Sequence, residues 1–160
     1  VYDPSVFLRQ KDRNTDEIYI SYSTTKTQNR TYLYNIKTKE KKLVKEQIIP
    51  SGHEPNDYIV ERLECPSHDG RVVPITITRH KNTPIDGSAE LLLYGYGSYG
   101  HSMSPTFSST RLSLIKRNII WATAHIRVGM ERGMRWWKEG KLLNKKNTFK
   151  DYVACAKFLI

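Results

Sequence analysis

The stretch LLLYGYGSYGHSM, residues 91–103, places three tyrosines and three glycines directly behind a run of leucines. Phenol hydroxyls can donate hydrogen bonds to a bound group, and glycines allow backbone angles that side chains forbid. The residue types leave two interpretations open. Tyr94, Tyr96 and Tyr99 either line a binding loop with hydroxyl donors, or they cover a core while the glycines form a tight turn.

A second stretch with charged side chains, HIRVGMERG, occupies residues 125–133. Arg127 and Glu131 are predicted to form an ion pair, which either shapes a site or is an ordinary pair on the surface. The five histidines share no metal-ligand spacing, so no metal site and no cofactor is expected. They are His53, His68, His80, His101 and His125.

Basic residues are concentrated at the end of the chain. The formal net charge is +10, and the last 50 of the 160 residues carry 12 basic and 3 acidic side chains. Lys138, Lys141, Lys145 and Lys146 flank a turn-like stretch there. They could contact the phosphates of a nucleic acid, but a solvated lysine face is the more common explanation of such a cluster. Nucleic-acid binding is therefore kept only as the minor interpretation.

Composition bounds the class of protein. The mean hydropathy of −0.59 and 26% charged residues are typical of a soluble protein, and no apolar stretch approaches the roughly 20 residues that a bilayer span requires. The first residues show no secretory signal. Cys65 and Cys155 are isolated, which fits a reducing compartment better than a disulfide scaffold. These features predict a cytoplasmic protein without a membrane segment.

Strand patterns lie on both sides of a linker. Residues 16–45 contain EIYISYS, TYLYNI and a shorter apolar pair, which predict an antiparallel meander of three strands. Residues 48–57 contain two prolines and a glycine and predict a linker. Residues 58–80 then predict an antiparallel hairpin that turns at Asp69 and Gly70.

The pattern changes after residue 90 to runs that are apolar without alternation. Residues 91–94 and 119–126 predict buried strands, with a helical stretch around 111–117 between them. Strand, helix and strand make a βαβ unit, which favours a parallel arrangement. Together with the antiparallel hairpin, this predicts a mixed sheet and the α/β class.

A last helix is predicted in NTFKDYVACAKFLI, residues 147–160. Thr148 and Asp151 resemble a capping box with Asp in place of Glu, and Asn147 or Thr148 would be the cap. Apolar side chains recur at helical spacing. They are Phe149, Tyr152, Val153, Ala156, Leu159 and Ile160. The sequence stops on this apolar face, so we expect its last residues to dock onto something present elsewhere.

Three segments, taken in order, resemble the prolyl oligopeptidase family of serine peptidases, and within it the oligopeptidase B group. They are LLLYGYGSYG, RLSLIKRNIIWATAHIRVGMERG and WWKEGKLLNKKNTFKDY. The similarity runs from about residue 58 to residue 160. Residues 16–45 are less specifically similar to the last blade of the β-propeller that precedes the hydrolase domain in these enzymes.

The resemblance implies roles for the two stretches described first. In α/β-hydrolases one donor of the oxyanion hole comes from the loop after the third strand, and the family resemblance places it on the hydroxyl of Tyr96. Gly95 and Gly97 flank that tyrosine. Arg127 and Glu131 also belong to the active-site loops, but neither is expected to be catalytic.

The sequence departs from the family pattern within residues 125–131. The family generally reads His-x-Arg-Gly-Gly-Gly-Glu, whereas Val128 and Met130 stand here in place of two glycines. If either position needs a positive φ, a β-branched valine at 128 would be strained.

The expected organisation has three parts: the end of a β-propeller over residues 1–47, a linker over 48–57, and the first half of an α/β-hydrolase catalytic domain over 58–160. The sequence contains no Gly-x-Ser-x-Gly, and the Asp and His of the triad follow that serine in this fold. The resemblance implies a serine endopeptidase that cuts short peptides after Arg or Lys. We expect a fragment, inactive alone, whose partner is the C-terminal half of the catalytic domain.

Two other hypotheses stay open. The chain is a stand-alone basic module that binds an acidic partner or nucleic acid, which salt-sensitive binding would reveal, or it is a small α/β domain without active chemistry. A structural excerpt, a split gene and decayed coding sequence are alternative origins of the fragment. The glycines lost at positions 128 and 130 would fit decay.

Overall fold

The computed structural model describes residues 5–10, 12, 14–104 and 106–160. Each of its two sheets has four strands. Within these residues, no helix combines the length and the apolar character that crossing a bilayer demands.

The chain forms two compact units, which are described separately. One consists of the segments up to Asp57 and of Ser104–Thr110, and the other of Tyr58–Met103 and Arg111–Ile160. A segment far along the sequence therefore belongs to the first unit. The division at residues 47 and 57 into propeller end, linker and catalytic half stays a prediction.

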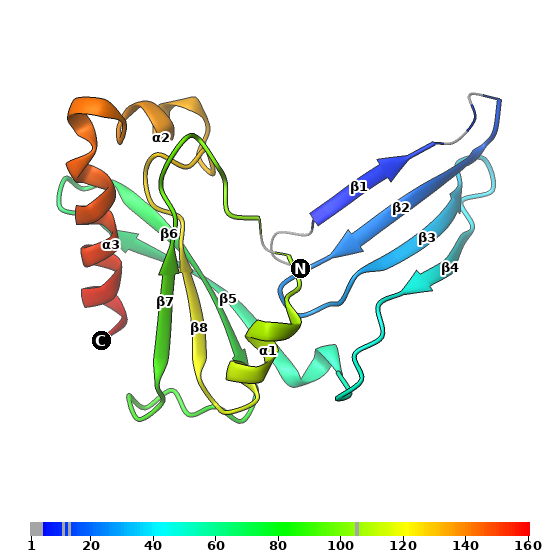
Figure 1. Ribbon diagram of the computed structural model, residues 1–160, viewed down its shortest axis with the longest axis horizontal. Coiled ribbons are helices and arrows are strands. Elements are labelled where there is room, and N and C mark those ends of the chain that lie inside the picture. The colour runs from blue at the N-terminus through cyan, green and yellow to red at the C-terminus, as the bar shows by residue number, and fades with distance from the viewer. Residues whose placement is uncertain (1–4, 11, 13, 105) are drawn as a thin grey trace. The chain divides into compact units, whose positions relative to one another are not determined.

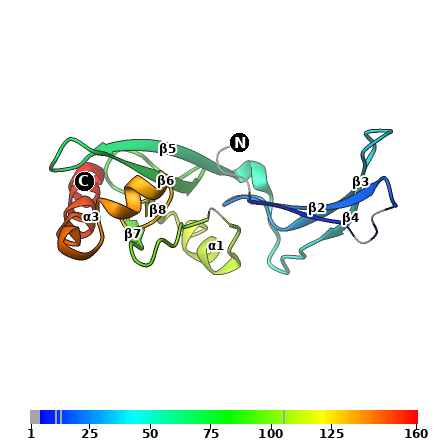
Figure 2. The same cartoon turned by 90° about the horizontal axis from the view of Figure 1, so that it is seen from above.

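The sheet of the first unit is antiparallel, with its strands in chain order (Figure 1). They are β1 (Ser5–Arg9), β2 (Glu17–Ser23), β3 (Arg30–Asn35) and β4 (Lys41–Glu46). Viewed from above, β2, β3 and β4 lie in one thin layer (Figure 2). The three strands predicted over residues 16–45 are confirmed, but the sheet has a fourth strand, β1, that the pattern did not predict.

β1 was missed because its sequence does not alternate between apolar and polar residues. Val6, Phe7 and Leu8 are three consecutive apolar residues, and all three are exposed. The strand is defined instead by its pairing with β2, from Ser5 opposite Ser23 onwards. Backbone hydrogen bonds of this kind are available to almost any sequence.

The sheet of the second unit is mixed, in the order β5–β6–β8–β7. Its strands are β5 (Tyr58–Pro66), β6 (Val72–His80), β7 (Leu91–Gly95) and β8 (Ile120–Ala124). The hairpin of β5 and β6 turns as predicted, with Gly70 at a φ of 76°. β7 and β8 are parallel and joined through α1 (Ser109–Ile115). The predicted α/β fold with a mixed sheet is confirmed.

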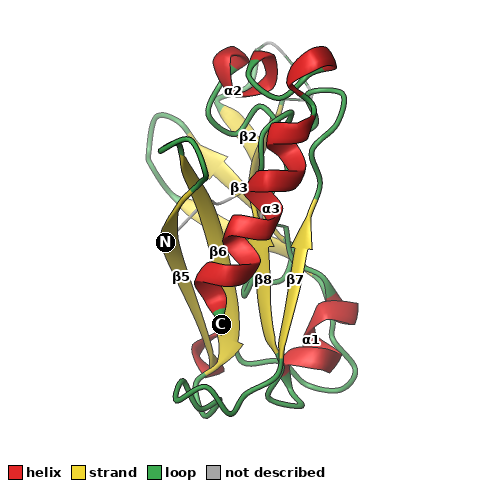
Figure 3. Cartoon of the chain, turned by 90° about the vertical axis from the view of Figure 1, so that its left-hand side faces the viewer, coloured by secondary structure: helices red, strands yellow, loops and turns green. Residues whose placement is uncertain are grey.

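One face of this sheet is covered by α3 (Lys146–Leu159), which crosses in front of the strands in Figure 3. The shorter helices are η1 (Pro55–Asp57), α2 (Met134–Lys138) and η2 (Leu142–Asn144). The core is formed by side chains of β5, β6 and β8 together with side chains of α2 and α3. Its most buried members include Cys65, Val73, Ile75, Ala122, Ala124, Trp136 and Cys155.

The predicted capping box of the last helix is wrong. α3 is capped by Lys145, whose side chain makes no capping hydrogen bond. Asn147 donates instead to the carbonyl of Glu139, at 2.9 Å, and the Thr148 hydroxyl to that of Gly140, at 3.4 Å. Asp151 is fully buried and turns away from the helix start, because it has a tertiary partner that the local pattern does not contain.

The buried stripe of α3 consists of Thr148, Asp151 and Cys155. Of the apolar side chains that the periodicity singled out, Tyr152 and Leu159 pack against the core, whereas others, such as Phe149, are exposed. A carboxylate thus occupies a core position where helical periodicity alone favours an apolar side chain.

Candidate active site

Two loops leave the mixed sheet at the same edge, because β7 and β8 are parallel and their carboxyl ends coincide. We call residues 95–103 the tyrosine loop and residues 125–133 the arginine loop. The N–H of Gly100 donates to the carbonyl of Val128 at 3.0 Å. Ligands of open α/β sheets bind beyond the carboxyl ends of strands, so this edge is where a site is expected.

The three tyrosines differ in their surroundings. Tyr94 stacks on Trp121, with ring centroids 5.9 Å apart, and Tyr99 is 92% exposed. Tyr96 is 37% exposed, and its ring meets the ring of His101 edge to face at 5.8 Å. Within the described residues its hydroxyl has no hydrogen-bond partner. The ring is therefore held by a neighbour while the hydroxyl remains available as a donor.

The glycines around Tyr96 are needed for space rather than for unusual backbone angles. A Cβ on Gly97 would lie 2.5 Å from the carbonyl oxygen of Arg127 and 2.6 Å from Cγ2 of Thr148. A Cβ on Gly95 would lie 2.9 Å from the ring of Tyr152. The positive φ angles of this loop are at Tyr99 and Gly100. Gly95 and Gly97 were expected to permit backbone angles that side chains forbid, but neither has a positive φ.

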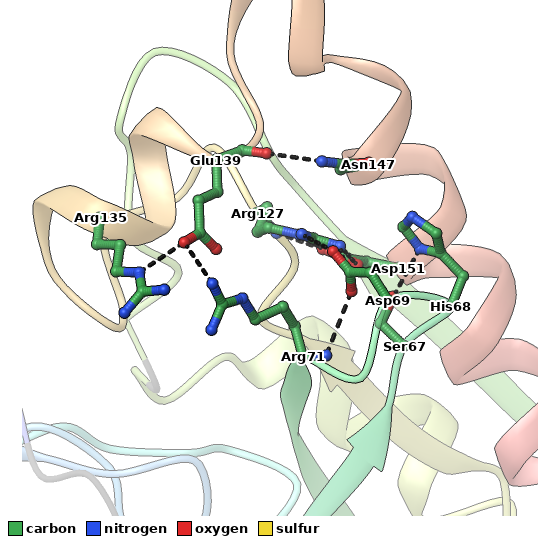
Figure 4. A network of polar contacts seen from close by, with 9 residues as sticks. All are labelled: Ser67, His68, Asp69, Arg71, Arg127, Arg135, Glu139, Asn147 and Asp151. Carbon is green, nitrogen blue, oxygen red and sulfur yellow. Dashed lines mark hydrogen bonds and ion pairs between the residues drawn. The ribbon is translucent and has the colours of Figure 1, made fainter.

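Arg127 lies in a buried charge cluster, and its predicted ion pair with Glu131 is wrong. Its side chain is 1% exposed and lies between two carboxylates (Figure 4). Nη2 and Nε donate to Asp151 at 2.6 and 2.8 Å. Nη1 donates to Asp69 at 2.6 Å. The carboxylates come from α3 and from the β5–β6 turn, so the cluster ties three parts of the unit together.

Charge pairing governs the ionisation of this cluster. Burial by itself would lower the pKa of Arg127, but the hydrogen bonds and charges of Asp151 and Asp69 raise it above its usual value. Burial likewise acts to raise the pKa of Asp69, and the bonds from Arg127 lower it below its usual range. Asp151 also accepts a hydrogen bond from the hydroxyl of Ser67 at 2.6 Å. Arg127 and Asp69 are therefore held in the ionised form.

Ser67, His68 and Asp151 do not form a nucleophilic triad, although a serine, a histidine and an aspartate lie close together. The Ser67 hydroxyl donates to Asp151. His68 Nδ1 lies 3.2 Å from Oγ of Ser67. A nucleophilic serine must instead give its proton to a histidine base. Here the serine proton is directed at a carboxylate that is already neutralised by an arginine, so the arrangement is structural.

Glu131 links the arginine loop to the end of the tyrosine loop. Its Oε1 accepts the N–H of Met103 at 2.9 Å and lies 3.7 Å from His125 Nδ1, with both side chains buried. Burial acts to raise the pKa of Glu131, but the contact with His125 and the bond from Met103 lower it below its usual value. An ionised carboxylate thus holds the backbone of the tyrosine loop.

The contacts of His125 Nε2 indicate which tautomer the ring adopts. Nε2 lies 2.8 Å from the Thr76 hydroxyl and 3.2 Å from Nη1 of Arg62. A guanidinium can only donate, so Nε2 acts as the acceptor. The proton is then on Nδ1, facing Glu131.

Val128 and Met130, which replace glycines of the family pattern, differ in their backbone conformation. Val128 is buried with a φ of 79°, so the strain expected for a β-branched residue is present there. Met130 has no positive φ. The substitution of glycine therefore strains the backbone at Val128 and not at Met130.

Two of the four lysines of the basic stretch make internal contacts. Lys141 lies 3.5 Å above the ring of Trp137. The ammonium group of Lys145 donates to the carbonyl of Gly97 and, at 3.1 Å, lies beside the Ser98 hydroxyl. Lys138 and Lys146 are exposed. The Lys145 contact could not be predicted, because Lys145 lies 48 positions from Gly97 and 47 positions from Ser98 along the chain.

The residues singled out from the sequence lie in the two segments that follow β7 and β8, and their role in an active site stays a prediction. They are Gly95, Tyr96, Gly97, Arg127 and Glu131. Sequence reasoning missed Ser67, Asp69, Lys145 and Asp151. Asp69 was interpreted as a turn residue and Asp151 as part of a cap, and both roles are common for aspartate. Within the described residues, no group of three or more His, Cys, Asp or Glu side chains could hold a metal ion.

Comparisons with known proteins agree with this architecture. The model of the prolyl oligopeptidase family matches residues 105–160. A dipeptidyl aminopeptidase BI from Pseudoxanthomonas mexicana is 41% identical over 93% of this chain and 21% of its own length. Protease 2 from Moraxella lacunata is 35% identical over 96% of this chain and 22% of its own length.

Solved structures of the same kind share the fold. Oligopeptidase B from Trypanosoma brucei, in a closed form with covalently bound antipain, superposes with a TM-score of 0.90 at 32% identity, over 99% of this chain and 23% of that chain. Oligopeptidase B from Leishmania major gives 0.88 at 33% identity, over 99% and 23%. The chain thus spans about a fifth of the length of the relatives it matches. It belongs to the prolyl oligopeptidase family of serine peptidases, as a fragment related to oligopeptidase B.

Proposed function

We propose that these residues supply the oxyanion-hole side of the active site of a serine endopeptidase that cuts short peptides after Arg or Lys. Tyr96 donates its hydroxyl to the negative charge that develops on the carbonyl oxygen during acyl transfer. Such a donor must be in position before the charge forms. The observation that carries the proposal is the free hydroxyl of Tyr96, half-exposed on a loop at the carboxyl end of β7.

The nucleophile must come from elsewhere, because the 160 residues contain no Gly-x-Ser-x-Gly and a tyrosine donor alone cannot attack a carbonyl. We propose that they are inactive alone. The preference for Arg or Lys follows from the resemblance to oligopeptidase B. The buried, free thiols of Cys65 and Cys155 support a reducing compartment, and we place the enzyme in the cytoplasm.

The remainder of the catalytic domain is the proposed partner, and β7 is the edge along which it joins. β7 is the last strand of its sheet, and Leu91 and Leu92 on it are exposed. An apolar groove of about 580 Å³ beside the strand is lined by residues that include Leu93 and Leu159. An unpaired edge with apolar side chains is a template for another strand.

The test is complementation. The chain is co-expressed with the C-terminal half of a catalytic domain of the family, and hydrolysis of an arginyl amide is measured. We expect activity from the pair and none from either half. Tyr96→Phe should lower kcat by about 100- to 1000-fold, whereas Tyr94→Phe, two residues earlier on β7, should change it little. Activity that persists in Tyr96→Phe would exclude the oxyanion role.

A further inference from the structure

We propose that Lys145 is a positioning residue that fixes the tyrosine loop from the start of α3. This inference rests on the proposed role of Tyr96. The lysine ammonium donates to the carbonyl of Gly97, the residue directly after Tyr96, and lies 3.1 Å from the Ser98 hydroxyl. A cation thus holds two consecutive residues beside the proposed donor.

The backbone at Gly97 has little room on its other sides. Gly97 is buried, and a Cβ there would lie 2.5 Å from the carbonyl oxygen of Arg127 and 2.6 Å from Thr148 Cγ2. Thr148 and Lys145 both come from the start of α3. The tyrosine loop therefore packs directly on the first turn of this helix, and Lys145 adds a charge-assisted bond to that packing.

Lysine is a poor local choice at this position. The cap residue of a helix normally offers a side-chain acceptor to the first backbone N–H groups, and a positive charge is unfavourable at a helix N-terminus. Lys145 makes no capping bond. A residue that violates local preference usually has a tertiary reason, and the contact with Gly97 is such a reason.

Lys146 provides an internal comparison. It has the same charge and lies in the same turn, but it is exposed. A general electrostatic effect of the basic stretch would involve both lysines. A positioning effect involves only the lysine that contacts the tyrosine loop.

The consequence for catalysis is specific to one kinetic parameter. A loop that is free to move still binds substrate, but it places the Tyr96 hydroxyl correctly only part of the time. Misplacement of an oriented group by about 1 Å can cost about 100-fold in rate. Loss of Lys145 should thus lower kcat and leave KM nearly unchanged, because Tyr96 acts on the transition state.

The experiment compares Lys145→Met with Lys146→Met in the co-expressed pair. We expect Lys145→Met to lower kcat by about 10- to 100-fold with KM within about twofold, and Lys146→Met to leave both unchanged. Lys145→Arg, which keeps a cationic donor, should recover most of the loss. Equal effects of the two methionine variants, or a loss that appears only in KM, would overturn the proposal.

A second measurement does not depend on activity. Hydrogen exchange is followed at the amides of Gly100 and His101, which donate to Val128 and Ser98, in the 160-residue chain and in the pair. Lys145→Met should accelerate exchange there by at least about tenfold, while Lys146→Met should not. Acceleration in a pair that lacks peptidase activity would retain the positioning role and reject the proposed function. Unchanged exchange would reject the positioning role itself.

Discussion

The two loops at the carboxyl edge of the mixed sheet are built on opposite principles. The tyrosine loop exposes Tyr96 and Tyr99 and is fixed mainly by bonds from outside, from Lys145 and Glu131. The arginine loop buries the side chains of Arg127 and Glu131 and is fixed by Arg127, whose guanidinium is shared between two carboxylates. One loop presents groups to solvent and the other provides a rigid support for it.

The difference shows how a fold can hold an exposed donor in place. A loop that must leave a hydroxyl unpaired cannot be stabilised by that hydroxyl. Its order has to come from neighbours with strong internal contacts, and buried, fully paired charges supply such contacts. We expect variants of the arginine loop to affect mainly the free energy of unfolding. Variants of the tyrosine loop should affect catalysis more than stability.

The strongest test of this comparison is Arg127→Met. The change leaves Asp151 buried without its cation, and removing one partner of a buried pair typically costs about 3–5 kcal/mol. We expect a loss of this size in the free energy of unfolding, measured by urea denaturation. Arg135→Met removes an exposed partner of Glu139 and should cost under about 1 kcal/mol. Similar losses in both variants would mean that the buried cluster is not the support.

Gly97→Ala tests the close contact between the loops. The added methyl group would meet the carbonyl oxygen of Arg127 and Cγ2 of Thr148, and overpacking of this kind costs about 1–3 kcal/mol. The same urea denaturation measures the loss. Adding Thr148→Ser removes one of the two contacts and should recover part of it. No recovery would indicate that the contact with the Arg127 carbonyl oxygen, and not the contact with Thr148, sets the cost.

Glu131→Gln tests the bond that crosses from one loop to the other. Replacing an ionised acceptor should cost about 1–2 kcal/mol at neutral pH. The pKa of Glu131 in the folded protein is lowered from 4.5, so its stabilisation is present above that value and is lost as the pH falls through the lowered pKa. The difference in unfolding free energy between the two proteins should therefore shrink below about pH 4.5.

The control for this pH dependence is Glu61→Gln, which removes a partly exposed carboxylate. It should cost under about 1 kcal/mol. A gap between Glu131→Gln and the unmodified chain that stays constant from neutral to acidic pH would show that the charge of Glu131 is not what holds Met103.

The smallest expected effect distinguishes strain from packing at Val128. Its φ of 79° suits glycine, so Val128→Gly should be more stable than Val128→Ala by about 1 kcal/mol, although both lose the buried side chain. At Val73, a buried residue near the start of β6, the order should be reversed, with alanine more stable than glycine by about 0.5–1 kcal/mol. Thermal unfolding of the four variants measures both orders. The same order at both positions would show that Val128 is not strained.

The fold was largely predictable because its signals are local. Alternation in residues 16–35, the Asp69–Gly70 turn and the apolar runs of β7 and β8 each depend on neighbours in sequence. β1 was not predictable, since its exposed side chains carry no pattern and only pairing with β2 defines it. The tyrosine loop was recognised because its glycines and tyrosines are consecutive.

The partners of the charged residues were not predictable. Arg127 and Glu131 are four positions apart and of opposite charge, which favours a local pair, yet the backbone directs them to different neighbours. Arg127 meets Asp69, 58 positions away, and Glu131 meets Met103, 28 positions away. Nothing in the spacing of those residues distinguishes them from surface charges.

The amino-acid sequence by itself determined the α/β class, the mixed sheet and the glycine-tyrosine stretch behind β7, because periodicity, turn chemistry and consecutive motifs act over a few residues. Only the tertiary structure decided that Asp151 is a buried counter-ion, that Lys145 contacts the tyrosine loop, and that Gly97 is required for space. Buried charges and close contacts join residues far apart in the chain, and their partners are set by how the strands and helices pack.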